Sequence, residues 1–533
     1  MLVRDFLERS ADRHPDKICL VAGGERLSYR HVDTEANRLA HALRSAGVGR
    51  GDRVVISMPN VLEAPVALFG TLKAGAAFVF IHPDTPEEKL RHVIGDCGAT
   101  AFLGWASPAA RPVLEAVLAS RASLALVGLA GPQAAELATS SPLAVTWTDL
   151  LSGQPEDRPA RVNIDLDLAC LIYTSGSTGR PRGVICCHDN VVFASGSIIE
   201  YVGNVEDDVI YNALPLSFDY GLYQVLMAFR FGGTVVLGRG FTYPARILDE
   251  IVRERVTGLP GVPTLFALLL RMNLEKYDLR SLRYMTNTAA ALPTPHVREL
   301  RRRLPWVRLI KMYGLTETKR TLWLPPEELD RRPGSVGIAI PGTEVWLEDE
   351  RGRRLGPGEV GELVVRGRHV MRGYWNDPQA SAERFPPGPL PGERVCRTGD
   401  LFRRDEDGFY YFLARRDDVI KTRGEKVAPR EVEAVLLEHP EVLLAAARGV
   451  DDPVLGQAIE VFVVPRAKGL QVADLRRHCA RRLEPFARPK TIHLVDELPH
   501  TTSGKVLRRA LDDSRTDEPP EPVAPGASRR PDP

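Results

Sequence analysis

Alternation between helix-type patterns and short apolar runs is the feature that most constrains the fold of this chain. Between Leu27 and about Leu103, the stretch HVDTEANRLAHALRSAG has the apolar period of an amphipathic helix, and the runs RVVISM and AAFVFI are short and bounded by Gly or Pro. Buried strands separated by helices in this way are typical of parallel α/β units. A second series runs from Leu168 to about Ile310. Both series predict an α/β fold.

The rest of the chain predicts further parts. The polar, Pro-containing stretch LSGQPEDRPARVNID indicates a linker between the two series. From about Gly334, short apolar runs with Gly and Pro turns predict a β-rich subdomain, and after Asp417 the pattern predicts a small α+β domain. We therefore expect a large N-terminal core over residues 1–415, a small C-terminal domain over 416–512 and a disordered Pro-rich tail over 513–533.

Composition excludes several classes of function. The 533 residues include 70 Lys and Arg against 69 Asp and Glu, so neither nucleic acid nor an anionic membrane is the expected partner. No run approaches the roughly 20 apolar residues of a membrane span, and the N-terminus lacks a signal-peptide pattern. The seven cysteines show neither zinc spacing nor an obvious disulfide framework. We expect a cytoplasmic protein with reduced thiols.

One segment suggests phosphate binding. Residues 171–184, LIYTSGSTGRPRGV, place hydroxyls and glycines between an apolar strand and a β-like run. Glycines allow backbone N–H groups to close around phosphate oxygens, hydroxyls donate further hydrogen bonds, and Arg182 can offset charge. Taken alone, a Ser/Gly-rich segment is more often a flexible connector.

Five ordered motifs downstream change that interpretation. They are Tyr313-Gly-Leu-Thr-Glu-Thr318, Gly361-Glu-Leu-Val-Val-Arg-Gly367, Arg397-Thr-Gly-Asp-Leu401, Arg415-Arg-Asp-Asp-Val-Ile-Lys421 and Pro499-His-Thr-Thr-Ser-Gly-Lys505. Together with the first segment they resemble the adenylate-forming superfamily of acyl-CoA synthetases, luciferases and nonribosomal peptide synthetase adenylation domains, over roughly residues 5 to 510. Arg182 stands where many members have Lys, and Ala414 where many have Gly.

The resemblance implies an ATP site. Its expected members are Thr174, Ser175, Gly176, Ser177, Thr178, Gly179, Tyr313, Thr316, Asp400, Arg415 and Lys505. Asp400 would accept the ribose hydroxyls, and Glu317 would bind the cofactor Mg²⁺. Thr174, Glu317 and Lys505 would be the catalytic residues, with Lys505 reaching the reacting carboxylate and the α-phosphate. Without the resemblance, Glu317 and Lys505 would be ordinary surface residues.

The same resemblance implies a second half-reaction. In this superfamily the small C-terminal domain is a mobile lid that rotates between adenylation and attack by a thiol, which separates two chemistries in one cleft. Asp417 matches the hinge position, and Gly424 matches the loop that lines a pantetheine tunnel.

A set of charged and aromatic residues indicates the acid that is activated. Asp219 matches the aspartate that pairs with the substrate ammonium in amino-acid adenylation domains, and Lys319 and Arg320 suit a second carboxylate. The combination resembles the stand-alone β-amino acid adenylation enzymes of macrolactam polyketide pathways that use 3-methylaspartate or aspartate. There, equivalents of Asp219 and Thr288 hold the amino group. Tyr220, Tyr223, Asp219, Thr288, Lys319 and Arg320 are therefore the expected substrate-binding residues.

Ordinary structural roles remain open for these residues. Asp219 could cap the following helix, Lys319 and Arg320 could form a solvated helix face, and the two tyrosines could be helix packing. No phosphopantetheine attachment sequence is found, so the expected thiol partner is a separate acyl carrier protein. Arg476-Arg-His478 and Arg481-Arg482 could contact an acidic carrier.

The predicted function is ATP-dependent adenylation of an acidic β-amino acid and its transfer to an acyl carrier protein. The alternatives are a fatty-acyl or aryl-CoA ligase, a stand-alone α-amino acid adenylation enzyme and, in a different class, a catalytically dead adenylate-binding sensor. The sequence leaves open the identity and stereochemistry of the acid, which carboxylate reacts, whether a carrier or CoA accepts the acyl group, and the oligomeric state.

Overall fold

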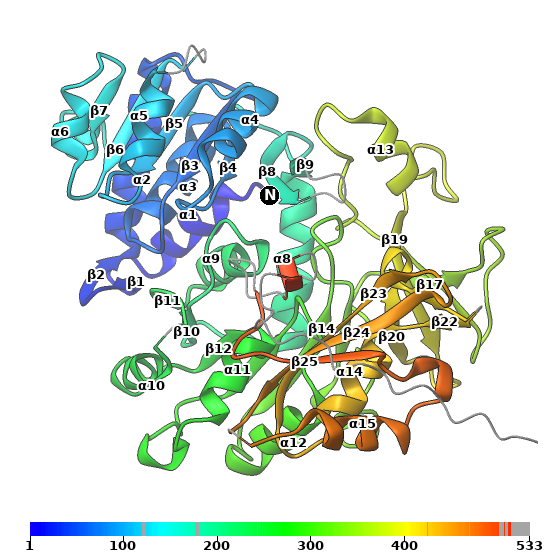
Figure 1. The fold of residues 1–533 in the computed structure, drawn as a ribbon. Helices are drawn as coiled ribbons and strands as arrows, with labels where there is room; N and C mark the ends of the chain where they lie inside the picture. Colours follow the sequence, from blue (N-terminus) through cyan, green and yellow to red (C-terminus); the bar gives the residue numbers. More distant parts are fainter. Residues whose placement is uncertain are drawn as a thin grey trace, which may run out of the picture. The chain divides into compact units, whose positions relative to one another are not determined.

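The computed structural model of the chain describes residues 1–119, 124–175, 181–241, 243–423, 425–467, 469–499, 506 and 510–512. It divides into two compact units: the first contains Met1–Asp417, and the second begins at Asp418 (Figure 1). The large unit consists of helices and mixed sheets, and the other unit consists of a smaller sheet with two helices. The predicted α/β fold class is therefore confirmed.

A seven-stranded sheet in the first unit carries the predicted phosphate segment. Its order is β7-β6-β5-β3-β4-β8-β9. The strands are β3 (Arg53–Ser57), β4 (Ala77–Phe80), β5 (Ala101–Trp105), β6 (Leu126–Ala130), β7 (Ala144–Thr146), β8 (Leu168–Ser175) and β9 (Pro181–Cys187). All neighbouring pairs are parallel except the β8–β9 hairpin.

A nine-stranded sheet in the same unit carries most of the other site residues. Its order is β16-β15-β14-β13-β12-β10-β11-β1-β2. The strands are β1 (Ile18–Ala22), β2 (Glu25–Ser28), β10 (Val209–Asn212), β11 (Thr234–Leu237), β12 (Gly258–Gly261), β13 (Tyr284–Asn287), β14 (Arg308–Tyr313), β15 (Leu322–Leu324) and β16 (Ile338–Ala339). Its central strands are parallel, so their carboxyl ends meet at one edge.

The two sequence series do not correspond one to one with these sheets. Strand β8 opens the second series but pairs with β4 of the first, through the register Phe78↔Cys170. Strands β1 and β2 precede most of the first series yet extend the nine-stranded sheet through β11. The polar segment 152–164 contains no helix or strand, as expected of a linker, but it does not separate the sheets.

Helices cover both sheets. They are α1 (Arg4–Arg13), α2 (Tyr29–Ser45), α3 (Glu63–Ala74), α4 (Glu87–Cys97), α5 (Arg111–Ala119), α6 (Ala134–Ala138), α7 (Trp147–Leu151), α8 (His188–Val202), α9 (Asp219–Phe231), α10 (Pro244–Arg253), α11 (Pro263–Leu270) and α12 (Thr294–Arg303). Helix α2 begins at a Ser28 cap, whose hydroxyl accepts from His31 N at 3.2 Å, and buries Val32, Leu39 and Leu43.

The predicted β-rich part is a four-stranded antiparallel sheet. It contains β17 (Glu344–Glu348), β18 (Val360–Arg366), β19 (Cys396–Arg404) and β20 (Tyr410–Arg415), in that order. The short helix α13 (Pro378–Arg384) lies between β18 and β19 in sequence. Strand β19 pairs with β20 in a register that places Asp400 opposite Arg415.

The second unit has a sheet and a core of its own. Its strands are β21 (Ile420–Thr422), β22 (Glu425–Val427), β23 (Val442–Asp452), β24 (Gly456–Pro465) and β25 (Thr491–Leu494), and its helices are α14 (Pro429–Leu437) and α15 (Val472–Ala480). Leu436, Val461 and Leu475 are fully buried in its core. Over the whole described part of the chain, every helix is too short or too polar to cross a membrane.

Candidate active site

One tight loop between β14 and β15 carries residues of both predicted subsites. Thr321 N donates to Tyr313 O at 2.8 Å, which closes the loop. A Cβ on Gly314 would lie 1.8 Å from the carbonyl oxygen of Lys319, so only glycine fits there. Lys319 has a φ of 56°, in the left-handed region that non-glycine residues avoid. Such strain is typical of functional loops because it fixes side-chain directions.

Asp400, on β19, is a buried carboxylate with one oxygen left over. Its Oδ2 accepts a hydrogen bond from Tyr313 Oη at 2.6 Å, and Arg415 Nε lies 3.4 Å from Oδ1. Within the described residues, Oδ1 has no hydrogen-bond donor. Burial raises the pKa of Asp400, although Arg415, Tyr313 and Arg384 act in the opposite direction. An unsatisfied buried acceptor is costly, and a ribose hydroxyl is a suitable donor for it.

Glu317 lies in the β14–β15 loop and is almost fully buried. Its Oε1 accepts from Tyr374 Oη at 2.6 Å, and Arg384 Nε lies 3.9 Å from the same oxygen. The part of the chain that the structure describes contains no group of three or more metal-binding side chains. Mg²⁺ in nucleotide enzymes uses one or two carboxylates together with water and phosphate oxygens. A single glutamate therefore fits the metal that the predicted site needs.

The predicted phosphate segment lies on the β8–β9 hairpin. Thr174 is half-buried and pairs in register with Arg182, whose Nε lies 3.1 Å from Asp377 Oδ2. Thr316 is half-buried in the β14–β15 loop. We name Thr174, Tyr313, Thr316, Glu317, Asp400 and Arg415 the nucleotide end of the site.

Several predicted residues lie outside the described part of the chain. These are Gly176, Ser177, Thr178, Gly179, Gly424 and Lys505, together with the side chains of Ser175 and Asp417. Asp417 directly precedes the start of the second compact unit at Asp418. The phosphate, hinge, tunnel and lysine roles of these residues stay predictions.

The residues predicted to bind the acid gather near the carboxyl ends of the parallel strands. Asp219, Tyr220 and Tyr223 lie in the first turns of α9, and Thr288 directly follows β13. Phe218 occupies the N-cap position of α9, so Asp219 is not the capping residue that the structural alternative requires. Arg320 Nη1 lies 3.7 Å from Asp219 Oδ2, too long for a hydrogen bond.

Lys319 and Arg320 are both buried, which excludes the alternative of a solvated charged face. Lys319 has no exposed surface, and its Nζ makes no hydrogen bond within the described residues. It lies 5.8 Å from the ring centroid of Tyr223. Burial raises the pKa of the nearby Cys186 thiol, but Cys170 and the Lys319 charge lower it by more. We name Asp219, Tyr220, Tyr223, Thr288, Lys319 and Arg320 the acid end.

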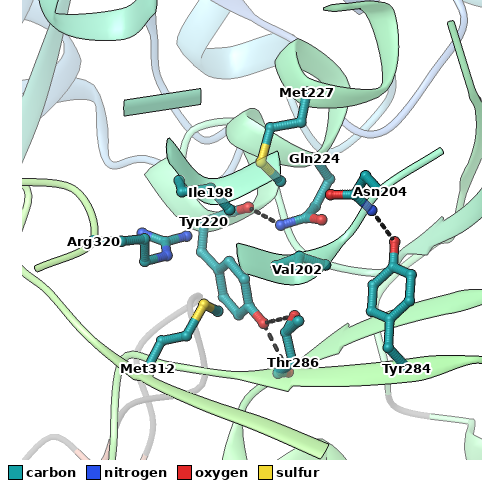
Figure 2. Close-up of a pocket in the computed structure, with 10 residues that line it drawn as sticks. All are labelled: Ile198, Val202, Asn204, Tyr220, Gln224, Met227, Tyr284, Thr286, Met312 and Arg320. Carbon is teal, nitrogen blue, oxygen red and sulfur yellow. Dashed lines mark hydrogen bonds between the residues drawn. The ribbon is translucent and has the colours of Figure 1, made fainter. Parts of the chain in front are cut away.

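Tyr220 and Arg320 both line a small cavity, as Figure 2 shows. Its hydroxyl donates to Thr286 O at 2.8 Å and also bonds Thr286 Oγ1 at 2.6 Å, and Arg320 Cζ lies 4.7 Å from its ring centroid. Burial raises the pKa of Tyr220 to about 12, so the hydroxyl stays protonated near neutral pH. This cavity measures about 10 Å³, which is room for one water.

Sequence reasoning did not identify Tyr374, Arg384 and the thiol pair Cys170 and Cys186. Tyr374 and Arg384 follow the Gly361–Gly367 motif by several residues and reach Glu317 only through tertiary packing. The two cysteines are opposite each other in the β8–β9 register. That register could have been predicted from the hairpin, because the strands flank a short loop.

Comparisons with known proteins identify the family of this chain. The model of the AMP-binding enzyme family matches residues 7–375, and that of the AMP-binding enzyme C-terminal domain matches residues 431–505. A long-chain-fatty-acid–CoA ligase of Escherichia coli O157:H7 is 32% identical, over 96% of this chain and 94% of that protein. A dimodular nonribosomal peptide synthase of Bacillus subtilis is 33% identical over 95% of this chain, which spans 21% of that protein.

Solved structures lead to the same family. The anthranilate CoA ligase AuaEII in complex with anthranoyl-AMP has a TM-score of 0.87 and 26% identity, covering 97% of each chain. ATP-bound MatB from Rhodopseudomonas palustris has a TM-score of 0.85 and 28% identity, covering 96% of this chain and 99% of that one. The chain belongs to the AMP-binding enzyme family and is an adenylate-forming ligase.

Proposed function

We propose that this enzyme adenylates an acidic β-amino acid of the aspartate or 3-methylaspartate type. It then transfers the acyl group to the phosphopantetheine thiol of a separate acyl carrier protein, in polyketide macrolactam biosynthesis. The observation that carries the substrate class is the charge of the acid end, where two buried cations, Lys319 and Arg320, outnumber the one buried carboxylate, Asp219, which lies 3.7 Å from Arg320.

Charge balance favours an acidic amino acid. The three buried side chains sum to one positive charge, and an uncompensated buried charge is expensive. An amino acid with a second carboxylate has a net charge of −1 and neutralises the cluster. Its ammonium can bind Asp219, whose 3.7 Å contact with Arg320 leaves acceptor capacity, while its spare carboxylate binds Lys319 and Arg320. A neutral amino acid would leave one positive charge uncompensated.

The space behind the acid end supports a short substrate. Tyr220 is held by two hydrogen bonds to Thr286, and the cavity that Tyr220 and Arg320 line has room for only one water. A long acyl chain would not fit in this cavity unless it displaced the tyrosine. The small size of this cavity weighs against a fatty-acyl-CoA ligase. That alternative is favoured by the names of several relatives.

The nucleotide end suits the first half-reaction. The substrate carboxylate attacks the α-phosphorus of ATP and pyrophosphate leaves, so negative charge builds on the phosphates. Mg²⁺, held by Glu317 and phosphate oxygens, would offset part of that charge. Asp400 would accept the ribose hydroxyls and orient the nucleotide, with Arg415 beside it. Thr174 would hold a phosphate, and Lys505 would bind the reacting carboxylate and the α-phosphate.

A carrier protein as acceptor is supported by basic residues of the second unit. Arg476, Arg477, Arg481 and Arg482, on or just after α15, are exposed. Acidic carrier surfaces would be attracted to such a patch, mainly through the association rate. The seven cysteines are buried and free, which is compatible with the reducing cytoplasm that we propose for the enzyme.

The substrate class is tested by ATP–pyrophosphate exchange. The panel contains aspartate-type β-amino acids, the corresponding amides, α-amino acids, a dicarboxylic acid without an amine, fatty acids and aryl acids. We expect the acidic β-amino acids to give the highest kcat/KM, because only they satisfy both Asp219 and the cations. Exchange with fatty or aryl acids and none with amino acids would overturn the proposal.

Matched variants connect the preference to the cations. Lys319→Met and Arg320→Met should each lower kcat/KM for the acidic substrate about 10- to 100-fold. Each change removes the charge-assisted hydrogen bond that we propose to the spare carboxylate of the substrate. They should leave the KM for ATP within about twofold. Arg331→Met removes a highly exposed arginine of the same unit and should change neither. If the variants leave the ratio of kcat/KM for the acidic substrate to kcat/KM for its amide unchanged, the two cations contribute only to folding.

The acceptor is tested separately. Adenylated substrate is offered to CoA and to purified carrier proteins, and we expect transfer to a carrier to be the faster. Arg476→Glu with Arg481→Glu should slow carrier loading at low ionic strength and leave exchange unaltered. Arg301→Glu with Arg302→Glu, on α12, is the charge-matched control. Equal rates with CoA and no effect of the α15 variants would identify a CoA ligase.

A further inference from the structure

Residues 373–385 join three parts of the active site that are far apart in sequence. Trp375 N donates to Gly183 O of β9 at 2.7 Å, so the segment pairs alongside β9 of the phosphate hairpin. Tyr374 Oη reaches Glu317. At its other end, Arg384 Nη1 lies so close to Gly399 that a Cβ there would be 3.0 Å away. Gly399 precedes Asp400 in the Thr-Gly-Asp motif.

The Glu317 carboxylate is held on one side only. Oε1 accepts the 2.6 Å hydrogen bond from Tyr374 and faces Arg384 Nε at 3.9 Å. Tyr374 is itself fixed, because its backbone N donates to Ser381 Oγ at 2.8 Å and its ring packs edge-on against Phe385. No described residue donates a hydrogen bond to Oε2. That oxygen is therefore available to a ligand while Oε1 is occupied.

Arg384 offsets the charge of two carboxylates. Its side chain is about one-quarter exposed, and its Nε has no hydrogen-bond acceptor within the described residues. Burial lowers the pKa of Arg384, but Glu317, Cys396, Tyr374 and Asp400 together raise it by more. Asp400 and Glu317 are like charges that raise each other's cost of burial. The guanidinium therefore places one positive charge near both carboxylates.

We propose that Tyr374 and Arg384 are positioning residues for Glu317. They hold Oε1 so that Oε2 is presented to the Mg²⁺ of MgATP, and neither touches the reacting atoms. This inference rests on the proposed metal role of Glu317. Pre-orientation reduces the conformational freedom that the carboxylate loses when the metal binds. Loss of this pre-orientation should therefore weaken Mg²⁺ binding more than it lowers kcat.

The test measures the magnesium requirement. In Tyr374→Phe, the Mg²⁺ concentration for half-maximal exchange should rise about tenfold, the typical effect of one hydrogen bond to a charged group. The kcat at saturating Mg²⁺ and the KM for the acid should stay within about twofold. Mn²⁺ binding to the enzyme with ATP and no acid, followed by electron paramagnetic resonance, should weaken by a similar factor. A uniform loss of kcat with unchanged metal affinity would overturn the inference.

Two further variants separate the possible failures. Tyr411→Phe removes a similar hydrogen bond, from Tyr411 Oη to Asp405 Oδ2 at 3.0 Å, and should not change the metal requirement. Glu317→Gln must raise that requirement more than Tyr374→Phe does. If Glu317→Gln has no effect, the proposed metal role itself is wrong. If Glu317→Gln raises the requirement and Tyr374→Phe does not, only the present inference is wrong.

Arg384→Lys supplies an independent variant in case Tyr374→Phe fails to fold. It keeps the charge and loses the planar fork, so the metal requirement should rise by roughly threefold while kcat at saturating Mg²⁺ is kept. An unchanged requirement in this folded variant would remove Arg384 from the inference.

Discussion

The nucleotide end and the acid end of the site have opposite charge imbalances. At the nucleotide end, the buried carboxylates of Glu317 and Asp400 each accept one hydrogen bond and have one oxygen without a donor among the described residues. The arginines near them, Arg384 and Arg415, are partly exposed. At the acid end, buried cations outnumber the carboxylate, and Lys319 Nζ and Arg320 Nε lack hydrogen-bond acceptors within the described residues.

The difference shows which ligand each end is built for. A buried polar atom without a partner costs about 1–3 kcal/mol, so a ligand that supplies the missing partner gains binding free energy. The nucleotide end lacks donors, which ribose hydroxyls and a metal ion supply. The acid end lacks acceptors, which a substrate carboxylate supplies. The same loop, from Tyr313 to Arg320, contributes residues to both ends, and each end uses different side chains of it.

The largest effect should follow from Asp400→Asn. The amide is nearly isosteric but lacks the charge, so kcat/KM for ATP should fall about 100-fold, equivalent to about 2.7 kcal/mol. The KM for the acid at saturating ATP should change little, because Asp400 is not one of the residues of the acid end. Steady-state exchange kinetics measure both constants. Equal losses for ATP and acid would mean that the two ends are not independent.

A medium effect should follow from Tyr220→Phe at the acid end. The ring that packs on Arg320 remains, but both hydrogen bonds to Thr286 are lost, so Arg320 is less well placed. The KM for the acidic substrate should rise about five- to tenfold, equivalent to about 1–1.4 kcal/mol, and the KM for ATP should stay the same. The measurement is exchange kinetics at saturating ATP.

Tyr284→Phe is the matched control for this change. Tyr284 lines the same cavity from β13, and its hydroxyl accepts from Asn204 at 2.8 Å, but the contacts of Arg320 do not include it. It should lower stability by a similar amount and leave both KM values unaltered. A shared rise in KM would mean that cavity packing, rather than the position of Arg320, determines affinity.

Much of this organisation was predictable from local patterns. Apolar periods predicted the α/β class, and the ordered motifs indicated Glu317 and Asp400 through their resemblance to the adenylate-forming superfamily. Sheet assignment was less accessible. Strand β8 joins β4 although about 90 residues separate them, and only tertiary packing decides which sheet buries an apolar run.

The features of the site that the sequence could not show have the same explanation. Lys319 and Arg320 follow a motif in sequence, but their complete burial depends on the tight turn at Gly314 and on packing against Tyr223 and Tyr220. Tyr374 contacts Glu317 across a separation of 57 residues, which no helix or strand period can indicate. Long-range hydrogen bonds therefore had to come from the structure.

The smallest effect concerns pH and should distinguish the two ends without a mutation. Burial raises the pKa of Asp400, so its carboxyl takes up a proton at a higher pH than an ordinary aspartate as the solution is acidified. Below that pKa each pH unit lowers the ionised fraction about tenfold, and the protonated form loses acceptor capacity for ribose. The KM for ATP should therefore rise at acid pH, while the KM for the acid rises less.

Asp400→Asn should remove this pH dependence, because an amide does not titrate. Comparing the two profiles also cancels the protonation of ATP itself, which affects both proteins equally. A rise in the KM for ATP that persists unchanged in the variant would place the titrating group elsewhere. The nucleotide end would then depend on hydrogen bonding alone, and its contrast in charge with the acid end would lose its functional meaning.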